Sequence, residues 1–190
     1  MSNARRLSWD ARHGVGPVLD GRPEPFLLAN ADLIRSGGRA IDVAGGPGFT
    51  ACWMAARGLD VTLADWSVVA LRRATRRADG AGQALRTVAV DLEQAPFPDG
   101  PWDLIFCARF LHRPLFEDFP IALAPGGLLV VVHPTVSNLE RHDRPGRRHL
   151  LEDGELPGLV RRLQILRAEE GWGENGRHEA KIIARREGPP

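Results

Sequence analysis

The hydrophobic residues fall into short continuous apolar runs that alternate with segments of helical spacing. In the clearest helical segment, 67–78, apolar residues share one face and arginines occupy the other, and Ser67 is the predicted N-cap. The run 128–132 is apolar throughout, which is typical of a strand buried on both faces, and Pro125-Gly126-Gly127 before it is predicted to form a turn. Strands and helices that alternate in this way predict a parallel sheet with crossover helices.

The predicted elements span most of the chain. The expected strands are 39–44, 61–64, 85–90, 102–106, 128–132, 164–168 and 180–185, and the expected helices are 26–34, 49–57, 67–78, 115–123 and 156–163. Because only 171–178 separates the last two strands, they are expected to form an antiparallel hairpin at one sheet edge. The pattern predicts a single α/β domain over 1–190, with a Rossmann-like core at 39–190 and an N-terminal segment and first helix at 1–36. The core is expected to hold a mostly parallel seven-stranded sheet with a C-terminal antiparallel hairpin.

Composition narrows the class of protein. The 190 residues include 25 basic and 24 acidic side chains, a net charge of +1, which disfavours a general nucleic-acid binder. No run approaches the ~20 apolar residues of a membrane span, and the N-terminus lacks a signal-peptide core, so a cytoplasmic protein is expected. Cys52 and Cys107 lie inside apolar runs without metal-ligand spacing, so no metal site is predicted.

The strand ends carry the candidate chemistry, because open α/β sheets bind ligands outside the carboxyl ends of their strands. Asp42 precedes a glycine turn, and Gly46-x-Gly48-x-x-Ala51 within that turn matches the dinucleotide fingerprint, with Asp65 at the spacing of a ribose ligand. A carboxylate at Asp42 would repel a pyrophosphate by about 4 kcal/mol at ~4 Å and an effective dielectric of about 20. The turn therefore favours a cofactor with a cationic group, while a nicotinamide-dependent oxidoreductase or a nucleotide-binding module stays open as an alternative.

The ordered combination of these residues resembles a known family. Asp42-x-Ala44-x-Gly46-x-Gly48, then Asp65 and Asp91 at the next two strand ends, and Ala124-Pro125-Gly126-Gly127 are similar to the class I S-adenosylmethionine-dependent methyltransferases over about 39–133. Ala44 departs from the glycine that is commonest in the family. The resemblance implies S-adenosylmethionine as cofactor, S-adenosylhomocysteine as product and direct displacement at the methyl group.

The resemblance also implies roles for individual residues. Asp42 and the backbone of 44–48 would lie along the methionine part of the cofactor, Asp65 would accept hydrogen bonds from both ribose hydroxyls, and Asp91 would meet the adenine amino group. Trp66 and Leu92 would flank the adenine ring. The other residues that it assigns to the cofactor are Ala44, Gly45, Gly46, Gly48, Cys107, Ala108 and Arg109.

A narrower resemblance comes from two further segments. Trp9-Asp10-Ala11-Arg12 and the segment 109–116 are similar to a bacterial subgroup related to the tellurite-resistance and thiopurine-type methyltransferases. In that subgroup the N-terminal segment folds over the cofactor as part of a lid, which implies cofactor contacts for Trp9 and Arg12. His13 departs from the aromatic residue expected after Arg12.

The acceptor side is marked by histidines and arginines near the later strand ends. His112 and Arg113 follow the fourth strand and are the catalytic candidates, His112 as a general base, although Pro114 beside them is also typical of a helix start. His133 ends the fifth strand. The segment 141–148 holds four arginines against one aspartate, which fits either a clamp for an anionic substrate or a solvated loop. The substrate candidates are His133, Arg147, Arg148 and His149.

The favoured function is a methyltransferase that acts on a small molecule, since the chain is compact and carries no obvious additional binding domain. The arginines near the acceptor side leave an anionic acceptor open, and no membrane partner is expected. The alternative is a methyltransferase for RNA or protein, with 141–148 as the segment that binds this substrate. The arginines of 67–78 are expected on a solvated helix face.

Overall fold

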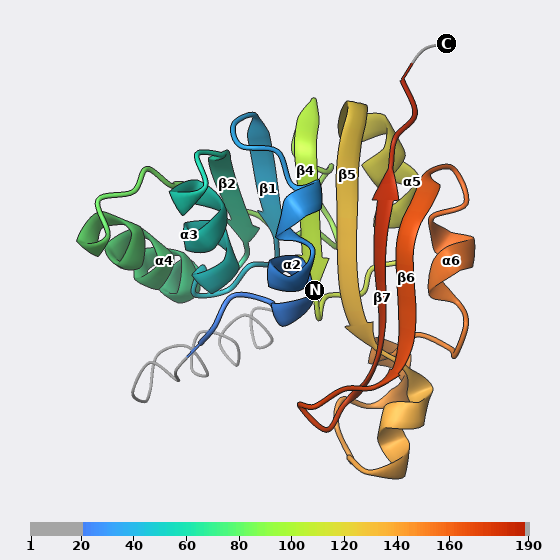
Figure 1. The fold of residues 1–190 in the computed structure, drawn as a ribbon. Helices are drawn as coiled ribbons and strands as arrows, with labels where there is room; N and C mark the ends of the chain where they lie inside the picture. The colour runs from blue at the N-terminus through green and yellow to red at the C-terminus, as the bar shows by residue number, and fades with distance from the viewer. Residues whose placement is uncertain (1–20, 189–190) are drawn as a thin grey trace. The chain divides into compact units, whose positions relative to one another are not determined.

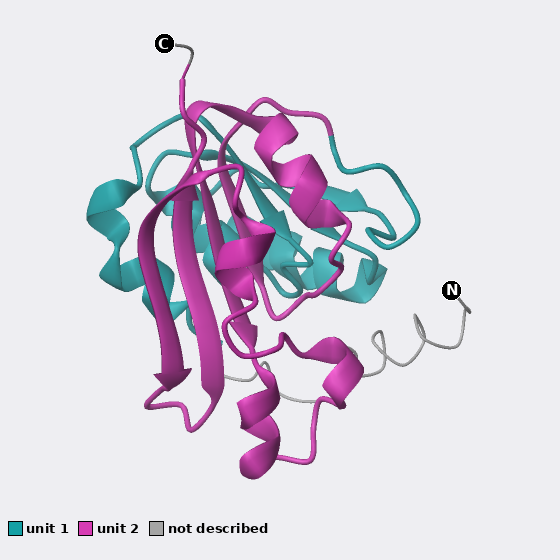
Figure 2. Cartoon of the chain, turned by 90° about the vertical axis from the view of Figure 1, so that its right-hand side faces the viewer, with its two compact units in different colours: residues 1–98 teal, residues 99–190 magenta. Residues whose placement is uncertain are grey.

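A computed structural model describes residues 21–188 of the chain. The chain divides into two compact units, residues 1–98 and residues 99–190 (Figure 2). The expectation of one domain over 1–190 stays a prediction.

The first unit contains a parallel sheet in the order β3-β2-β1, with helices along it (Figure 1). Its elements are α2 (Pro25–Ala29), η1 (Ala31–Leu33), β1 (Arg39–Val43), α3 (Phe49–Ala56), β2 (Asp60–Asp65), α4 (Val68–Gly80) and β3 (Arg86–Ala89). In β2 every residue after Asp60 is buried, whereas all four residues of β3 are exposed. The buried centre of the unit therefore lies at β1 and β2.

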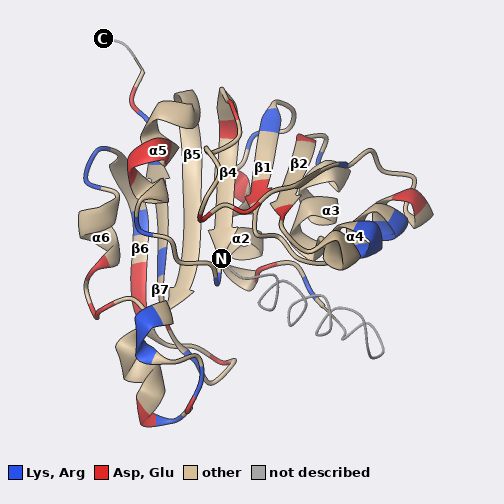
Figure 3. Ribbon diagram, turned by 180° about the vertical axis from the view of Figure 1, so that it is seen from behind, with Lys and Arg blue, Asp and Glu red and all other residues tan. Residues whose placement is uncertain are grey.

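Helix α4 follows the sequence prediction closely. Ser67 is its N-cap, because the Ser67 hydroxyl accepts a hydrogen bond from the Ala70 amide at 3.2 Å. The buried face of the helix consists of Ala70, Leu71, Ala74 and Ala78, and basic residues follow its other side (Figure 3). The small side chains of the buried face let the helix approach the glycine turn that precedes α3.

The second unit contains four strands in the order β4-β5-β7-β6. Strands β4 and β5 run parallel, while β7 is antiparallel to both β5 and β6. Its elements are β4 (Trp102–Ala108), α5 (Leu115–Ala122), β5 (Leu123–Pro134), η2 (Val136–Glu140), η3 (Arg147–His149), α6 (Leu156–Leu159), β6 (Gln164–Trp172) and β7 (His178–Arg185). The predicted antiparallel hairpin is therefore confirmed, with longer strands than the sequence indicated.

The fold class predicted from the sequence is confirmed. The strands form the mixed seven-stranded sheet of a Rossmann-like α/β fold, and β6 and β7 supply its antiparallel C-terminal part. Among residues 21–188, no helix has the length and apolar character needed to cross a membrane.

The predicted turn at Pro125-Gly126-Gly127 is wrong as a boundary, because β5 already begins at Leu123. Trp102 pairs with Leu123 but Leu104 pairs with Leu128, so β5 holds three more residues than β4 over this interval. The additional residues form a bulge in which Gly126 takes a left-handed φ of +77°. Pairing with the neighbouring strands thus keeps Pro125-Gly126-Gly127 within β5, although its composition is typical of a turn.

The predicted helix 26–34 is also interrupted. It divides into α2 and η1 at Asn30, whose side-chain amide donates a hydrogen bond to the Phe26 carbonyl at 2.8 Å. A side chain that bonds back to its own helix competes with continued helical pairing, and this explains the break.

Candidate functional site

The turn between β1 and α3 has an unusual backbone. Ala44, Gly46 and Gly48 have φ values of +53°, +54° and +76°, all in the left-handed region. An L-residue there costs roughly 1–2 kcal/mol, so Ala44 is held by its surroundings, including a hydrogen bond from its amide to the Ala64 carbonyl at 2.8 Å. Backbone strain of this kind is concentrated at functional sites.

Two of the glycines are required by close contacts. A Cβ atom at Gly48 would lie 2.6 Å from the Ala74 Cβ, because α4 approaches the start of α3 here. A Cβ atom at Gly45 would lie 2.4 Å from Cγ and 2.5 Å from Oδ2 of Asp42. The Asp42 carboxyl group therefore lies directly against the turn.

Asp42 is a buried acid with an unmet hydrogen-bond acceptor. It is only 1% exposed, and its Oδ2 has no hydrogen-bond partner within residues 21–188. Burial and the nearby Asp65 carboxylate raise the pKa of Asp42 to about 8, against a smaller lowering effect of the Ala51 backbone amide. A cationic group would favour the ionised form of this acid and pair with it, whereas a phosphate would keep the acid protonated and gain no ion pair.

Asp65 connects the glycine turn to α4. Its Oδ2 accepts a hydrogen bond from the Gly46 amide at 2.9 Å, and its Oδ1 accepts one from the Ser67 amide at 2.8 Å. These two bonds hold the carboxylate in a fixed orientation between the turn and α4. The side chain is 8% exposed and shares its surroundings with Asp42.

The other predicted adenine-side residues also lie in the first unit. Asp91 follows β3, where its Oδ1 accepts a hydrogen bond from the Glu93 amide at 3.0 Å and shapes a turn. Leu92 is buried and Trp66 is half-buried. The Val90 amide donates to the Asp65 carbonyl at 3.0 Å, which brings the ends of β2 and β3 together.

Arg77 also contributes to this turn, although the helix pattern predicted a solvated position for it. Its guanidinium lies 3.6 Å from the centre of the Phe49 ring, and its Nε donates to the Pro47 carbonyl at 3.2 Å. A signal was present in the spacing, because position 77 lies one helical turn after the buried Ala74. Arg77 therefore helps to fix the turn.

The remaining predicted cofactor residues fall in the second unit or outside the described residues. Trp9 and Arg12 lie outside residues 21–188. Cys107 is buried and Ala108 is half-buried at the end of β4, in register with Val131 and Val132 of β5.

Arg109 begins the segment after β4 with a left-handed φ of +57°. Its amide donates to the Val132 carbonyl at 2.9 Å. Its Nη2 lies 3.6 Å from Oε1 of Glu179, a β7 carboxylate that is 1% exposed. This ion pair partly compensates for the burial of the Glu179 charge.

His133 is the next-to-last residue of β5 and is 3% exposed. Its Nε2 lies 2.9 Å from the His149 carbonyl, whereas its Nδ1 has no hydrogen-bond partner within the described chain. Burial lowers the pKa of His133 to about 4, with Arg113 and Arg109 adding to the lowering and the His149 carbonyl and Glu179 opposing it. The ring is therefore neutral near pH 7, and since a carbonyl only accepts, the ring proton is on Nε2.

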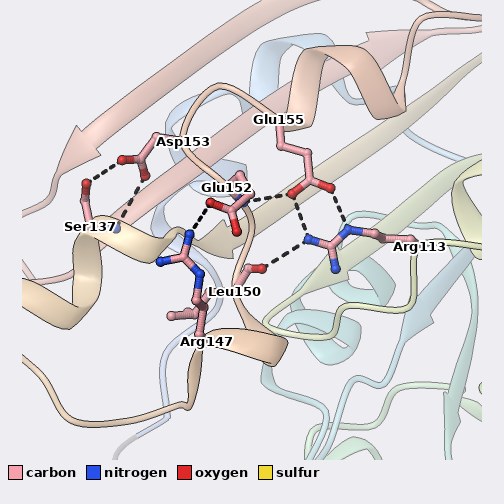
Figure 4. A network of polar contacts seen from close by, with 7 residues as sticks. All are labelled: Arg113, Ser137, Arg147, Leu150, Glu152, Asp153 and Glu155. Carbon is pink, nitrogen blue, oxygen red and sulfur yellow. Dashed lines mark hydrogen bonds and ion pairs between the residues drawn. The ribbon is translucent and has the colours of Figure 1, made fainter.

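Most other acceptor-side candidates have protein partners (Figure 4). Arg113 forms a bidentate ion pair with Glu155, at 2.5 and 2.8 Å, and also donates to the Leu150 carbonyl at 3.2 Å. Glu155 raises the pKa of Arg113, and Arg113 in turn lowers the pKa of Glu155. Arg147 pairs with Glu152 at 2.7 Å (Figure 4). The Arg113 contacts connect the segment after η3 to the residues just before α5.

The basic segment 141–148 also packs on its own unit. The Arg141 guanidinium lies 3.8 Å from the centre of the Trp172 ring, and His142 Nε2 lies 2.7 Å from the Gly176 carbonyl. Arg148 Nε donates to His149 Nε2 at 2.9 Å. Part of the positive charge that suggested a clamp is therefore placed against the β6–β7 hairpin and neighbouring side chains.

His112 is half-buried beside α5, and its carbonyl accepts the Leu115 amide at 3.0 Å. In the described part of the chain, no cluster of three or more His, Cys, Asp or Glu residues could hold a metal ion. The distinctive groups are therefore the acid-lined turn of the first unit and the His133 region of the second.

Residues 40–127 match the family described as "methyltransferase domain". This segment contains the glycine turn together with Asp42, Asp65 and Asp91. Residues 40–127 of the chain therefore carry a methyltransferase domain. The resemblance to methyltransferases seen in the sequence is thereby confirmed for this segment.

Two curated relatives carry methyltransferase names. The ubiquinone/menaquinone biosynthesis C-methyltransferase of Methylococcus capsulatus is 34% identical over 110 residues, which cover 52% of this chain and 44% of the relative. The demethylmenaquinone methyltransferase of Thermus thermophilus is 35% identical over 103 residues, covering 50% of this chain and 46% of the relative. The chain thus spans about half the length of the curated relatives it matches.

Solved structures support the fold. TehB from Haemophilus influenzae superposes with a TM-score of 0.73 at 17% identity, covering 86% of this chain and 62% of that one. A methyltransferase from Methanosarcina mazei gives a TM-score of 0.68 at 18% identity and covers 89% of this chain and 100% of that one.

S-adenosylmethionine is the cofactor of this family, and the turn fits it. The cofactor carries an ammonium and a sulfonium group and no phosphate. The unmet Asp42 carboxyl oxygen and the Cβ-free position at Gly45 suit a cationic ligand held close to the backbone.

Proposed function

We propose that this protein transfers the methyl group of S-adenosylmethionine to a small organic acceptor by direct displacement. The observation that carries the proposal is the buried Asp42 carboxyl group, which lies against the Gly45 backbone without a partner for Oδ2. Within a methyltransferase domain, this group is placed to receive the cationic part of the cofactor. The alternative of a dinucleotide would set a phosphate against the same acid.

Each end of the cofactor has its own residues in this proposal. Asp42 and the backbone of 44–48 hold the methionine part, and Asp65 accepts hydrogen bonds from the ribose hydroxyls. Asp91 meets the adenine amino group, while Trp66 and Leu92 flank the ring. The amide bonds from Gly46 and Ser67 support the ribose role, because they fix the Asp65 carboxylate in advance of binding.

The cofactor supplies an electrophilic methyl group on a positively charged sulfur. The contribution of the protein is to hold the cofactor and the acceptor in line, and positioning of this kind can supply ~7–11 kcal/mol of the barrier. The strained turn at Ala44 and its fastening by Arg77 support that role, since both restrict where the methionine part can lie. A dedicated general base is not required for every acceptor.

For the acceptor we propose an uncharged aromatic molecule of the hydroquinone type. The names of the two curated relatives refer to quinone methylation. Charge pairing in the second unit agrees with a neutral acceptor, since Arg109, Arg113 and Arg147 each face a glutamate. No contact of the described arginines favours an anionic acceptor, a polymer or a nicotinamide cofactor.

Calorimetry tests the cofactor assignment. S-adenosylhomocysteine is expected to bind the full-length protein and NAD(H) is not. Asp65→Ala is expected to weaken the binding of S-adenosylhomocysteine at least tenfold, because hydrogen bonds to a charged group contribute about 1.5–3 kcal/mol. Asp79→Ala, at an exposed acid of α4, is the matched control and should leave binding unchanged. Binding of NAD(H) without S-adenosylhomocysteine would refute the proposal.

A second experiment tests the acceptor class. Methyl transfer from labelled S-adenosylmethionine to 1,4-naphthalenediol is expected, and Arg147→Gln should leave its rate unchanged. A large loss of turnover in that variant, with cofactor binding intact, would instead support an anionic clamp.

A further inference from the structure

In the second unit, three buried acceptor atoms have no hydrogen-bond partner among the described residues. They are Nδ1 of His133, Oδ1 of Asn138 and Oε1 of Glu179, on side chains that are 3%, 2% and 1% exposed. A buried acceptor without a hydrogen bond destabilises a fold, so most such atoms find a partner within the protein. Of the three, Nδ1 of His133 belongs to a strand that pairs in parallel with β4 and lies near the carboxyl end of that strand, where a group can arrive from outside.

The His133 ring is fixed in a way that defines what Nδ1 can do. Its Nε2 donates to the His149 carbonyl at 2.9 Å, and this contact holds the ring and assigns its proton. The lone pair of Nδ1 is therefore an acceptor, and burial keeps the ring neutral by lowering its pKa to about 4. A partner for this atom has to be a hydrogen-bond donor.

The position of His133 is also relevant to catalysis. His133 lies at the carboxyl end of β5, next to the end of β4, where the Arg109 amide bonds the Val132 carbonyl at 2.9 Å. Glu179 of β7 is opposite Pro134, so its side chain leaves the sheet on the other face from His133, and its Oε1 lies 3.6 Å from the Arg109 guanidinium. The carboxyl ends of parallel strands are where sheets of this class bind ligands.

The charges around these atoms are balanced. Glu179 faces Arg109, and Arg113 is paired with Glu155, so the neutral His133 ring is not close to an uncompensated charge among these groups. An ammonium or a carboxylate entering here would disturb the balance, whereas a hydroxyl group would add a donor without charge. A hydroxyl is thus the donor that this environment fits best.

We propose that Nδ1 of His133 accepts a hydrogen bond from a hydroxyl group of the methyl acceptor. This assignment rests on the proposed function and deepens it, because it makes His133 a residue that selects hydroxyl-bearing aromatic acceptors. A site built to bind a hydroxyl discriminates strongly against an analogue that lacks it, since the protein acceptor is then left unpaired.

The test compares 1,4-naphthalenediol with 1,4-dimethoxynaphthalene, which has the same ring but no donor. Binding of each is measured calorimetrically to full-length protein saturated with S-adenosylhomocysteine. Wild type is expected to prefer the diol at least tenfold. His133→Gln keeps a donor at the position of Nε2 and removes Nδ1, so it should lose that preference, while His133→Asn, which keeps an acceptor at the δ position, should retain part of it.

His142→Gln is the matched control, because its Nε2 also contacts a backbone carbonyl, that of Gly176 at 2.7 Å, on an exposed histidine. It should leave both the selectivity and the affinity for S-adenosylhomocysteine unchanged. A purely structural role for His133 would lower the thermal stability of both His133 variants and leave the ratio between diol and diether as in wild type.

A measurement on the wild type covers the case in which His133 variants do not fold. The ¹⁵N resonance of His133 Nδ1 is expected to shift when the diol, but not the diether, is added to protein saturated with S-adenosylhomocysteine. The inference is overturned if the diol does not bind, or if it binds with the Nδ1 resonance and the His133→Gln selectivity unchanged. Failure to bind S-adenosylhomocysteine at all would refute the proposed function instead.

Discussion

Asp42→Asn tests two consequences of burying an acid beneath the glycine turn, which are the pH dependence of stability and the affinity for the cofactor. The substitution keeps the size of the side chain, and asparagine resembles the protonated acid because it carries no charge. Burial and the neighbouring Asp65 raise the pKa of Asp42 from 3.8 to about 8 in the folded protein. The variant should therefore change how stability depends on pH and how tightly the cofactor binds.

The sign of the pH effect follows from where the proton is bound. Between the unfolded pKa of 3.8 and the folded pKa of about 8, the folded state holds a proton that the unfolded state has lost. The stabilisation is fully present below 3.8 and is lost as the pH rises through 8. Each pH unit in this window lowers the free energy of unfolding by about 1.4 kcal/mol, so the loss from pH 5 to pH 7 is about 3 kcal/mol.

Urea unfolding at a series of pH values measures this effect directly. The free energy of unfolding of Asp42→Asn minus that of wild type should grow by about 1.4 kcal/mol per pH unit up to pH 8 and then level off. Asp79→Asn, at an exposed position of α4, is the control and should run parallel to wild type. Parallel curves for Asp42→Asn and wild type would show that the acid is not held protonated.

Cofactor binding gives an independent readout. A cationic ligand beside Asp42 favours the ionised acid, so S-adenosylhomocysteine should release a proton from wild type at pH 6–7. Calorimetry in buffers of different ionisation enthalpy detects this proton, and Asp42→Asn should show none. The variant should also bind the ligand about tenfold to hundredfold more weakly, as expected for the loss of a charged hydrogen bond. Proton-neutral binding to wild type would refute the placement of a cation at Asp42.

Three further predictions concern other residues. Gly45→Ala should abolish binding of S-adenosylhomocysteine, because its Cβ would lie 2.4 Å from a carboxyl carbon, whereas Gly80→Ala, with open space around it, should not. His133→Gln should remove a rise in unfolding free energy of about 1.4 kcal/mol per pH unit between pH 4 and 6.5, measured by urea unfolding, because the folded pKa of His133 is about 4. Arg113→Met should lower the unfolding free energy by about 1 kcal/mol through the loss of a half-exposed bidentate pair with Glu155, with ligand affinity unchanged; a loss of affinity would argue for a direct binding role.

Local chemistry made much of the fold predictable. Ser67 could be assigned as an N-cap from the residues that follow it, and α4 has the buried face that its spacing indicated. Errors arose where long-range pairing overrides local preference. Pro125-Gly126-Gly127 has the composition of a turn, but pairing with neighbouring strands converts it into a bulge of β5. The turn preferences of these residues do not indicate which strands will lie beside the segment.

The sequence was enough to locate the candidate site at the strand ends, but not to predict which side chains pair with one another there. The acids at Asp42, Asp65 and Asp91 could be found because strand ends are recognisable along a single sequence. The contact between Arg77 and the Pro47 carbonyl depends on how α4 meets the turn, and the pairing of Arg113 with Glu155 joins residues far apart in the chain. Charge partners of this kind are set by tertiary packing, so an arginine-rich segment alone could not reveal how much of its charge is paired.

Asp42 and His133, two of the buried titratable groups, act on stability with opposite signs, which has a consequence for the wild-type protein. Lowering the pH from 6.5 towards 4 costs stability at His133, because the unfolded chain takes up a proton that the buried ring resists. Over the same interval Asp42 gains stability as the pH falls. The two slopes, each about 1.4 kcal/mol per pH unit, nearly cancel wherever both parts of the chain unfold in one transition. A flat curve for wild type between pH 4 and 6.5 is therefore what two strongly perturbed groups would produce. Above pH 6.5 only the Asp42 slope remains, so the stability should fall towards pH 8, and a bound cation beside Asp42 should remove that fall.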